Sequence, residues 1–166
     1  MLCQTWHMTE RDYNQCVELH ADKLYRFILK NIRNSEDARD IVQSSFEKLW
    51  LKRSNVDSAT SKSYLYTVAY HEMIDQIRKR RKVSEIEEQP LYQRSAGQKK
   101  LVEMALSRLT DLQRSLVLLK DMEGYSYEEI SEVTGLNVVQ VKVYLHRARL
   151  IIRNYIGSLE KAMDFA

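Results

Sequence analysis

The sequence is poor in residues that interrupt helices and in residues that cross-link small secreted proteins. Its 166 residues include one proline, four glycines and two cysteines. So few helix breakers, beside abundant leucine, glutamate, lysine and arginine, predict an all-α fold. Cys3 and Cys16 are too few for a disulfide framework and lack metal-ligand spacing, so we expect Cys16 to pack as a small hydrophobe.

Long apolar runs and catalytic signatures are also missing. No apolar stretch reaches the length of a membrane span, and the first residues lack the pattern of a signal peptide. We therefore expect a cytoplasmic protein without membrane insertion. The four histidines are scattered, which predicts no metal site, and there is no phosphate-binding loop or nucleophile motif. We expect a protein that is not an enzyme and needs no cofactor.

The most specific pattern is a pair of helices joined by a tight turn near the C-terminus. Ser126, followed three residues later by Glu129, is a capping box that predicts the start of the first helix. Gly135 predicts its end, and Asn137 predicts a cap for a second helix that begins at Val138. A connection this short is typical of a helix-turn-helix.

The second of these helices has an apolar side and a basic side. The residues expected to pack inward recur at helical intervals: Val138, Val141, Leu145, Ala148 and Ile152. The other side is expected to carry Lys142, Val143, His146, Arg147, Arg149 and Arg153, with Val139 beside them. In a major groove, cations can meet phosphates and guanine edges, and methyl-bearing side chains can meet thymine. The pattern favours DNA binding, and a solvated basic face is the alternative.

A helix predicted at about 36–52 has strong apolar periodicity that includes Phe46. Its opposite side carries an acidic stripe: Asp37, Asp40, Ser44 and Glu47, with Gln43 nearby. Taken alone, these residues favour an ordinary solvated face over a partner-docking surface, because acids near a helix N-terminus also complement the helix dipole.

A helix predicted at about 64–81 ends in an unbroken basic run, Arg78–Lys82. One of its stripes consists of Tyr64, Thr67, His71, Asp75 and Arg78. Such a stripe can stack on unpaired bases and bond to them, while the basic run holds the backbone. A boundary position in the fold is an equal alternative for Tyr64, whereas Tyr66 and Tyr70 are expected in the core.

Two small helical domains joined by a flexible linker account for these segments. We place the domains at residues 10–82 and 98–160, and the linker, which holds the only proline, at 83–97. Before the helix-turn-helix, the second domain is expected to have helices at 98–109 and 111–122.

Four further expectations concern the first domain. Residues 1–9 are expected to be disordered, and a helix is predicted at 10–32. Ser35 is expected to cap the helix that follows. The polar segment 53–63 has no strong core signal and is predicted to be a loop.

Three segments together resemble bacterial sigma factors of the extracytoplasmic-function (ECF) type, in the sigma-70 family: Asp37–Trp50, Ser63–Lys82 and Leu109–Arg149. The resemblance covers about residues 10–155, with the three motifs in the family's order. It implies sigma regions 2 and 4 on either side of a linker. It also implies that the chain binds core RNA polymerase through the β′ and β subunits, recognises −35 and −10 promoter elements and helps to open the DNA.

The resemblance also implies roles for individual residues. Those expected to bind polymerase are Asp37, Asp40, Gln43, Phe46 and Glu47, with a place in the core as the alternative for Phe46. Those expected to bind single-stranded DNA at −10 are Tyr64, Thr67, His71, Asp75, Arg78, Arg80 and Arg81. Those expected at the −35 duplex are Lys142, Val143, His146, Arg147 and Arg149, the last touching phosphate or packing. The linker acids Glu85, Glu87 and Glu88 are expected to thread the polymerase, and an anti-sigma factor is an expected partner.

Two other classes of protein fit part of the pattern. A helix-turn-helix repressor or activator, with a ligand-sensing or dimerising first half, would explain the C-terminal segment equally well. It leaves the basic run and the acidic stripe without a role. A helical protein-binding adaptor explains the acidic stripe and little else.

Overall fold

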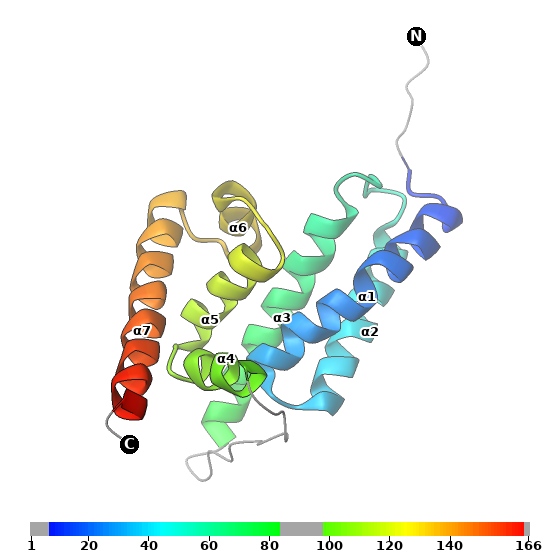
Figure 1. The fold of residues 1–166 in the computed structure, drawn as a ribbon. Helices are drawn as coiled ribbons and strands as arrows, with labels where there is room; N and C mark the ends of the chain where they lie inside the picture. The colour runs from blue at the N-terminus through cyan, green and yellow to red at the C-terminus, as the bar shows by residue number, and fades with distance from the viewer. Residues whose placement is uncertain (1–6, 84–97, 165–166) are drawn as a thin grey trace. The chain divides into compact units, whose positions relative to one another are not determined.

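The computed structural model describes residues 7–83 and 98–164 (Figure 1). In chain order its elements are α1 (Glu10–Ile32), α2 (Ser35–Lys52), α3 (Ser61–Val83), α4 (Gln98–Ser107), α5 (Asp111–Val117), the π-helical segment η1 (Leu118–Met122), α6 (Tyr127–Thr134) and α7 (Val138–Asp164). They form two compact units, one of α1–α3 and one of α4, α5, η1, α7 and most of α6. The predicted all-α fold of two helical domains is confirmed.

The limits predicted for the domains stay a prediction. The linker acids Glu85, Glu87 and Glu88 lie outside the described residues.

The first unit is a bundle of three mutually packed helices (Figure 1). Each helix contributes fully buried side chains at helical spacing, among them Leu24 and Ile28 of α1, Ile41 and Leu49 of α2, and Leu65, Tyr66 and Met73 of α3. Tyr66 and Tyr70 are buried, as predicted, and so is Cys16. Desolvation raises the pKa of the Cys16 thiol, which keeps it neutral and consistent with a packing role.

The beginnings of the first two helices correct two of the expectations. Residues 7–9 are ordered: Met8 is buried, and Thr9 caps α1 in a reciprocal box with Asp12. Asn34, and not Ser35, caps α2, because its side-chain oxygen accepts from the backbone N–H groups of Glu36 and Asp37, both at 3.0 Å. Asparagine is as good an N-cap as serine, so the sequence did not distinguish the two neighbours.

The segment before α3 contributes to the core, contrary to expectation. Val56 is buried, and so is Ser61, whose hydroxyl donates to the carbonyl oxygen of Ser58 at 2.7 Å. α3 consequently begins at Ser61, three residues before the predicted start at Tyr64. A single valine among polar residues has no periodicity, which is why its burial was missed.

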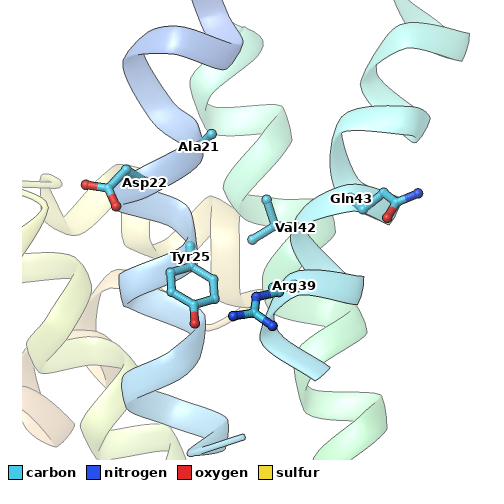
Figure 2. A pocket seen from close by; sticks show the side chains of 6 residues that line it. All are labelled: Ala21, Asp22, Tyr25, Arg39, Val42 and Gln43. Carbon is cyan, nitrogen blue, oxygen red and sulfur yellow. The ribbon is translucent and has the colours of Figure 1, made fainter. Parts of the chain in front are cut away.

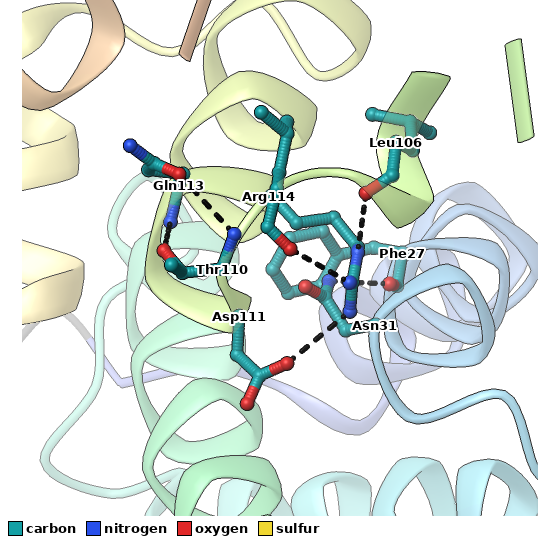
Figure 3. Close-up of polar contacts among 8 residues, drawn as sticks. Phe27, Asn31, Leu106, Thr110, Asp111, Gln113 and Arg114 are labelled. Atoms are coloured by element: carbon teal, nitrogen blue, oxygen red, sulfur yellow. Dashed lines mark hydrogen bonds and ion pairs between the residues drawn. The ribbon is translucent and has the colours of Figure 1, made fainter. Parts of the chain in front are cut away.

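A buried arginine lies at the connection between the first two helices of the second unit. Arg114 is 6% exposed and donates to the carbonyl oxygens of Leu106 and Leu109, at 3.1 and 3.0 Å (Figure 3). Its guanidinium also lies 3.3 Å from the Asp111 carboxylate. Leu106 lies in the last turn of α4 and Leu109 just beyond it, where helices leave acceptors without internal partners. Arg114 therefore fixes the connection between α4 and α5.

The predicted helix at 111–122 is not regular along its length. α5 ends at Val117, and a π-helical turn follows, in which the Glu123 N–H donates to the Leu118 carbonyl at 3.1 Å. Residues 114–119 are buried without interruption. Because that run has no helical period, the sequence could not locate the change of helix type.

The helix-turn-helix agrees with its sequence signals. Ser126 and Glu129 form the predicted capping box, and α6 ends at Thr134, followed by the predicted Gly135 cap with a φ of 74°. Asn137 caps α7: its side chain accepts from the Gln140 N–H at 2.8 Å, and its own N–H donates to the Gln140 side chain at 3.0 Å. Two reciprocal caps and a left-handed glycine thus set the turn that presents α7.

Candidate nucleic-acid and protein interfaces

The orientation of α7 in its unit is set by its apolar side. Val141, Leu145 and Ala148 are fully buried, while Val138 and Ile152 are half-buried. These five residues are the stripe predicted to face inward. The opposite side of the helix is therefore turned to solvent.

That exposed side carries all the residues predicted to meet duplex DNA. Lys142, Val143, His146, Arg147 and Arg149 are exposed. Lys142 is held over the ring of Tyr127, with its Nζ atom 5.2 Å from the ring centroid, and Lys120 lies 4.5 Å from the same centroid. The first residue of α6 thereby gathers two cations beside the exposed face of α7.

Arg149 differs from the other residues on this face because it has an acidic partner. Its Nη2 and Nε atoms lie 2.5 and 3.4 Å from the two carboxylate oxygens of Asp121 in η1. The hydrogen bond to Asp121 raises the pKa of Arg149. This two-pronged contact fastens α7 to η1, the packing role that was one of the two expected for this residue.

The stripe predicted on α3 changes from half-buried to exposed along the helix. Tyr64 and Thr67 are half-buried, and the Thr67 hydroxyl donates to the Ser63 carbonyl at 2.8 Å. His71 is exposed, with its ring centroid 5.7 Å from that of buried Tyr70. The first residues of this stripe are therefore only partly accessible to solvent.

Farther along the same helix, Asp75, Arg78, Arg80 and Arg81 are exposed. Asp75 and Arg78 form an ion pair at 3.5 Å, in which both side chains are more than half exposed. The end of α3 is therefore an accessible basic segment.

One ion pair joins two predicted surfaces. Arg80 at the end of α3 pairs with Asp37 in the first turn of α2. The sequence assigned these side chains to different tasks, and their meeting depends on the packing of α2 against α3, which neither helix's pattern reveals.

Of the five residues predicted to bind polymerase, three are exposed, Asp37 is half-buried and Phe46 is buried. Asp40, Gln43 and Glu47 face solvent, and the Gln43 amide donates to Glu47 at 3.0 Å. Phe46 is 7% exposed and lies edge-on to Tyr13, with ring centroids 6.3 Å apart. Phe46 therefore belongs to the core.

A shallow pocket of about 420 Å³ lies between α1 and α2, beside this acidic side (Figure 2). Its lining combines apolar and charged side chains: Ala21, Asp22, Tyr25, Arg39, Val42 and Gln43. Gln43 belongs to both the pocket and the exposed polar stripe. The pocket was not foreseen, because it needs two helices side by side.

A second unforeseen feature is a carboxylate shared between helices. Glu72 of α3 accepts from the Ser44 hydroxyl at 3.0 Å and pairs with Lys48 at 2.8 Å, both on α2. These contacts cross-link α2 to α3 beside the predicted docking stripe. An i, i+4 pair of hydroxyl and lysine on α2 was the only available signal, and it does not point to a particular partner.

Comparison with known proteins identifies the family. Residues 16–83 match Sigma-70 region 2, and residues 99–152 match Sigma-70, region 4. The sigma factor SigV of Bacillus subtilis is 30% identical over 144 residues, which cover 83% of this chain and 87% of SigV. The ECF sigma factor SigE of Mycolicibacterium smegmatis is 29% identical, over 88% of this chain and 62% of SigE.

A solved structure supports the same assignment. The sigma factor RpoE of Bartonella quintana, in complex with the anti-sigma factor NepR, superposes with a TM-score of 0.75 at 26% identity, over 89% of this chain and 98% of RpoE. No helix in the described part of the chain is long and apolar enough to span a bilayer. The chain belongs to the sigma-70 family as an ECF-type sigma factor, which binds core RNA polymerase and directs promoter-specific initiation of transcription.

Proposed function

We propose that the exposed face of α7 reads the −35 element as duplex DNA in the major groove. The observation that carries this proposal is the division of the helix, with a buried apolar stripe opposite an exposed face of Lys142, His146 and Arg147. Arg147 is suited to guanine, because a guanidinium can bond to two acceptors on that base. Arg149 contributes by holding the helix to Asp121, and its outer edge remains available to phosphate.

The stripe on α3 is assigned to the −10 element, as a platform for unpaired bases. Tyr64 and Thr67 are half-buried, a position in which a ring and a hydroxyl can line a recess. Farther along, Arg78, Arg80 and Arg81 are exposed and can hold the strand by its phosphates. Stacking and hydrogen bonding must offset the few kcal/mol that unpairing a base costs.

The exposed acidic stripe of α2 is the proposed docking surface for core polymerase, which the resemblance assigns to the β′ subunit. Asp40, Gln43 and Glu47 supply it with charge and hydrogen-bonding groups. The pocket beside it would receive an apolar side chain of the partner, because Tyr25 and Val42 contribute apolar surface to its lining. Aromatic or aliphatic anchors in such pockets dominate many interfaces.

The two domains are proposed to act together and without covalent chemistry. Two weak DNA contacts held on one polymerase gain from their high effective concentration, so neither domain needs high affinity alone. The proposed place of action is the cytoplasm, where polymerase and promoter meet. Because RpoE of B. quintana was solved with an anti-sigma factor, we also propose that an anti-sigma factor holds this chain inactive.

A reconstitution experiment tests the assignment of the surfaces. Full-length chain is mixed with core RNA polymerase, and binding is measured without DNA, followed by transcription from a mapped promoter. Asp40→Lys should weaken binding to core at least tenfold, because it reverses a charge in the proposed interface. Glu10→Lys makes the same change of charge in the first turn of α1 and should leave binding intact. Equal binding by both variants would rule out the α2 surface, and absence of promoter-dependent transcripts from the parent protein would contradict the whole mechanism.

A further inference from the structure

Two valines in the first two turns of α7 are exposed, although Val141 and Leu145 of the same helix are buried. Val139 is 70% exposed and Val143 is 41% exposed. They lie four residues apart and so share one face, separated by about 6 Å along the helix axis. Packing within the unit does not account for them, because the inward stripe of α7 is Val141, Leu145 and Ala148.

The first turn of α7 leaves little else to project from the helix. Val138 is half-buried and Val141 is fully buried. Gln140 is occupied by the cap, since its side-chain oxygen accepts from the Asn137 N–H at 3.0 Å. When a helix-turn-helix binds DNA, the first turns of the second helix meet the base edges. That contact falls here to Val139, which has no hydrogen-bonding group in its side chain.

The charge around the two valines points to DNA as their partner. Residues 138–153 contain no acidic residue, and four cations accompany the valines on this helix: Lys142, Arg147, Arg149 and Arg153. Phosphates on both sides of a groove complement such a surface. Within the major groove the apolar group on a base edge is the C5 methyl of thymine.

We propose that Val139 and Val143 read thymine methyl groups in the −35 element, an inference that rests on the proposed role of α7. A valine side chain suits this task because its χ1 angle is nearly fixed in a helix, so little rotational freedom is lost on contact. The distance between the two valines corresponds to about two base-pair steps of about 3.4 Å. The −35 element should therefore hold thymines, on either strand, about two steps apart.

Deoxyuridine substitution tests the contact directly, because it removes the C5 methyl group and keeps the base pair. Holoenzyme of the full chain with core polymerase is bound to a promoter identified by transcript start mapping. Each −35 thymine is replaced singly by deoxyuridine, at constant salt. Replacement at a contacted position should weaken binding about fourfold, the ratio expected from burial of one methyl-sized group. Thymines in the spacer between the two elements serve as control positions.

Valine-to-alanine variants, combined with the deoxyuridine substitutions, complete a double-mutant cycle between each valine and each thymine methyl group. On Val139→Ala holoenzyme one of the sensitive thymines should become indifferent to deoxyuridine, and on Val143→Ala the other should. Val102→Ala removes a valine of α4 that is 52% exposed, between the values of the two α7 valines, and should retain the full sensitivity to deoxyuridine. Alanine favours helix more than valine does, so the α7 variants are expected to fold.

The possible failures are distinguishable. If scrambling the −35 element abolishes binding but no deoxyuridine has an effect, the valine inference is overturned and the role of α7 stands. If Val139→Ala weakens binding equally on thymine and uracil DNA, or weakens binding to core without DNA, the valines contact something else. If scrambling the element and Arg147→Ala both leave initiation unchanged, the proposed role of α7 fails with it.

Discussion

The two helices proposed to meet DNA, α3 and α7, are built differently. α7 has an inward apolar stripe with three buried residues, a reciprocal N-terminal cap and an exposed opposite face with cations and valines. α3 is tied to α2 by two sets of side-chain contacts, Glu72 with Ser44 and Lys48, and Arg80 with Asp37. Its proposed base-contacting residues begin half-buried and become exposed only farther along.

The difference matches the physical state of each proposed target. A duplex has a groove that admits a protruding helix, so a reading face must stand clear of its own domain. An unpaired base must instead bind in a recess of the protein surface. The half-buried ring of Tyr64 and hydroxyl of Thr67 can line such a recess. The contacts between α3 and α2 would hold that proposed surface in place while the duplex is opened.

The largest expected effect tests whether the proposed DNA-binding faces of α3 and α7 depend on the buried residues on the opposite side of each helix. Leu65 of α3 and Leu145 of α7 are buried, and replacing either with alanine should lower the free energy of unfolding by about 2–5 kcal/mol. Urea denaturation followed by circular dichroism measures the loss. The exposed Leu51 provides the control, and Leu51→Ala should change stability little. A loss at Leu145 no larger than the control would contradict the packing described for α7.

The next effect separates base reading from phosphate contact. Arg147→Ala should weaken binding to the cognate −35 element by about 1–3 kcal/mol if the side chain reads guanine. Arg78→Ala should weaken binding alike on all sequences and reduce the salt slope by about one. Holoenzyme affinities on cognate and scrambled promoters, over a range of salt concentrations, give both quantities. Unchanged transcription from the chain's own promoter after Arg147→Ala would remove that residue from the reading face.

Left-handed residues at two helix ends should respond with opposite signs. Gly135, before α7, has a φ of 74°, so Gly135→Ala should destabilise the chain by about 1–2 kcal/mol. Arg33, after α1, adopts a φ of 57° despite its side chain, so Arg33→Gly should stabilise it by up to about 1 kcal/mol. Gly157→Ala, within α7 and with open space around the added methyl group, controls for helix propensity and should also stabilise. Denaturation midpoints decide the signs, and a stabilising Gly135→Ala would contradict the turn geometry.

The smallest expected effect compares the ion pairs that anchor the two helices. The side chains of Arg149 and Asp121 are both nearly half exposed, so their coupling should be about 0.2–1 kcal/mol and fall with added salt. Asp37 is more buried than Asp121, so its coupling to Arg80 should be larger. Double-mutant cycles that replace each aspartate with asparagine and each arginine with glutamine measure both energies. A stronger pair on α7 than on α3 would reverse the comparison.

Local signals in the sequence were sufficient for most of the helix positions. Capping boxes and glycines act within four residues, so both ends of α6 and the start of α7 were predicted correctly. The signals failed where structure depends on distant partners. Val56 is buried although it stands alone among polar residues, and the π-helical turn lies in a run of buried residues without a period.

The same contrast between local signals and long-range contacts holds for the candidate surfaces. The spacing of apolar residues alone distinguished the exposed side of α7 from its buried side. It gave no sign that Arg149 meets Asp121, that Arg80 meets Asp37, or that α1 and α2 form a shallow pocket. Each of these requires two elements to be brought together, which the pattern of one helix does not specify. The resemblance to a family supplied roles for the stripes but not these contacts.

If Arg80 contacts the −10 strand and Asp37 contacts polymerase, as the resemblance implies, their pairing would couple the binding of opened DNA to the binding of polymerase. A phosphate that engages this guanidinium competes with the carboxylate for it, and so leaves the first turn of α2 more negative. A polymerase cation that engages the carboxylate would in turn release the guanidinium toward the strand. Because coupling between two binding events is reciprocal, each ligand would then favour the other through the exchange of a single shared bond.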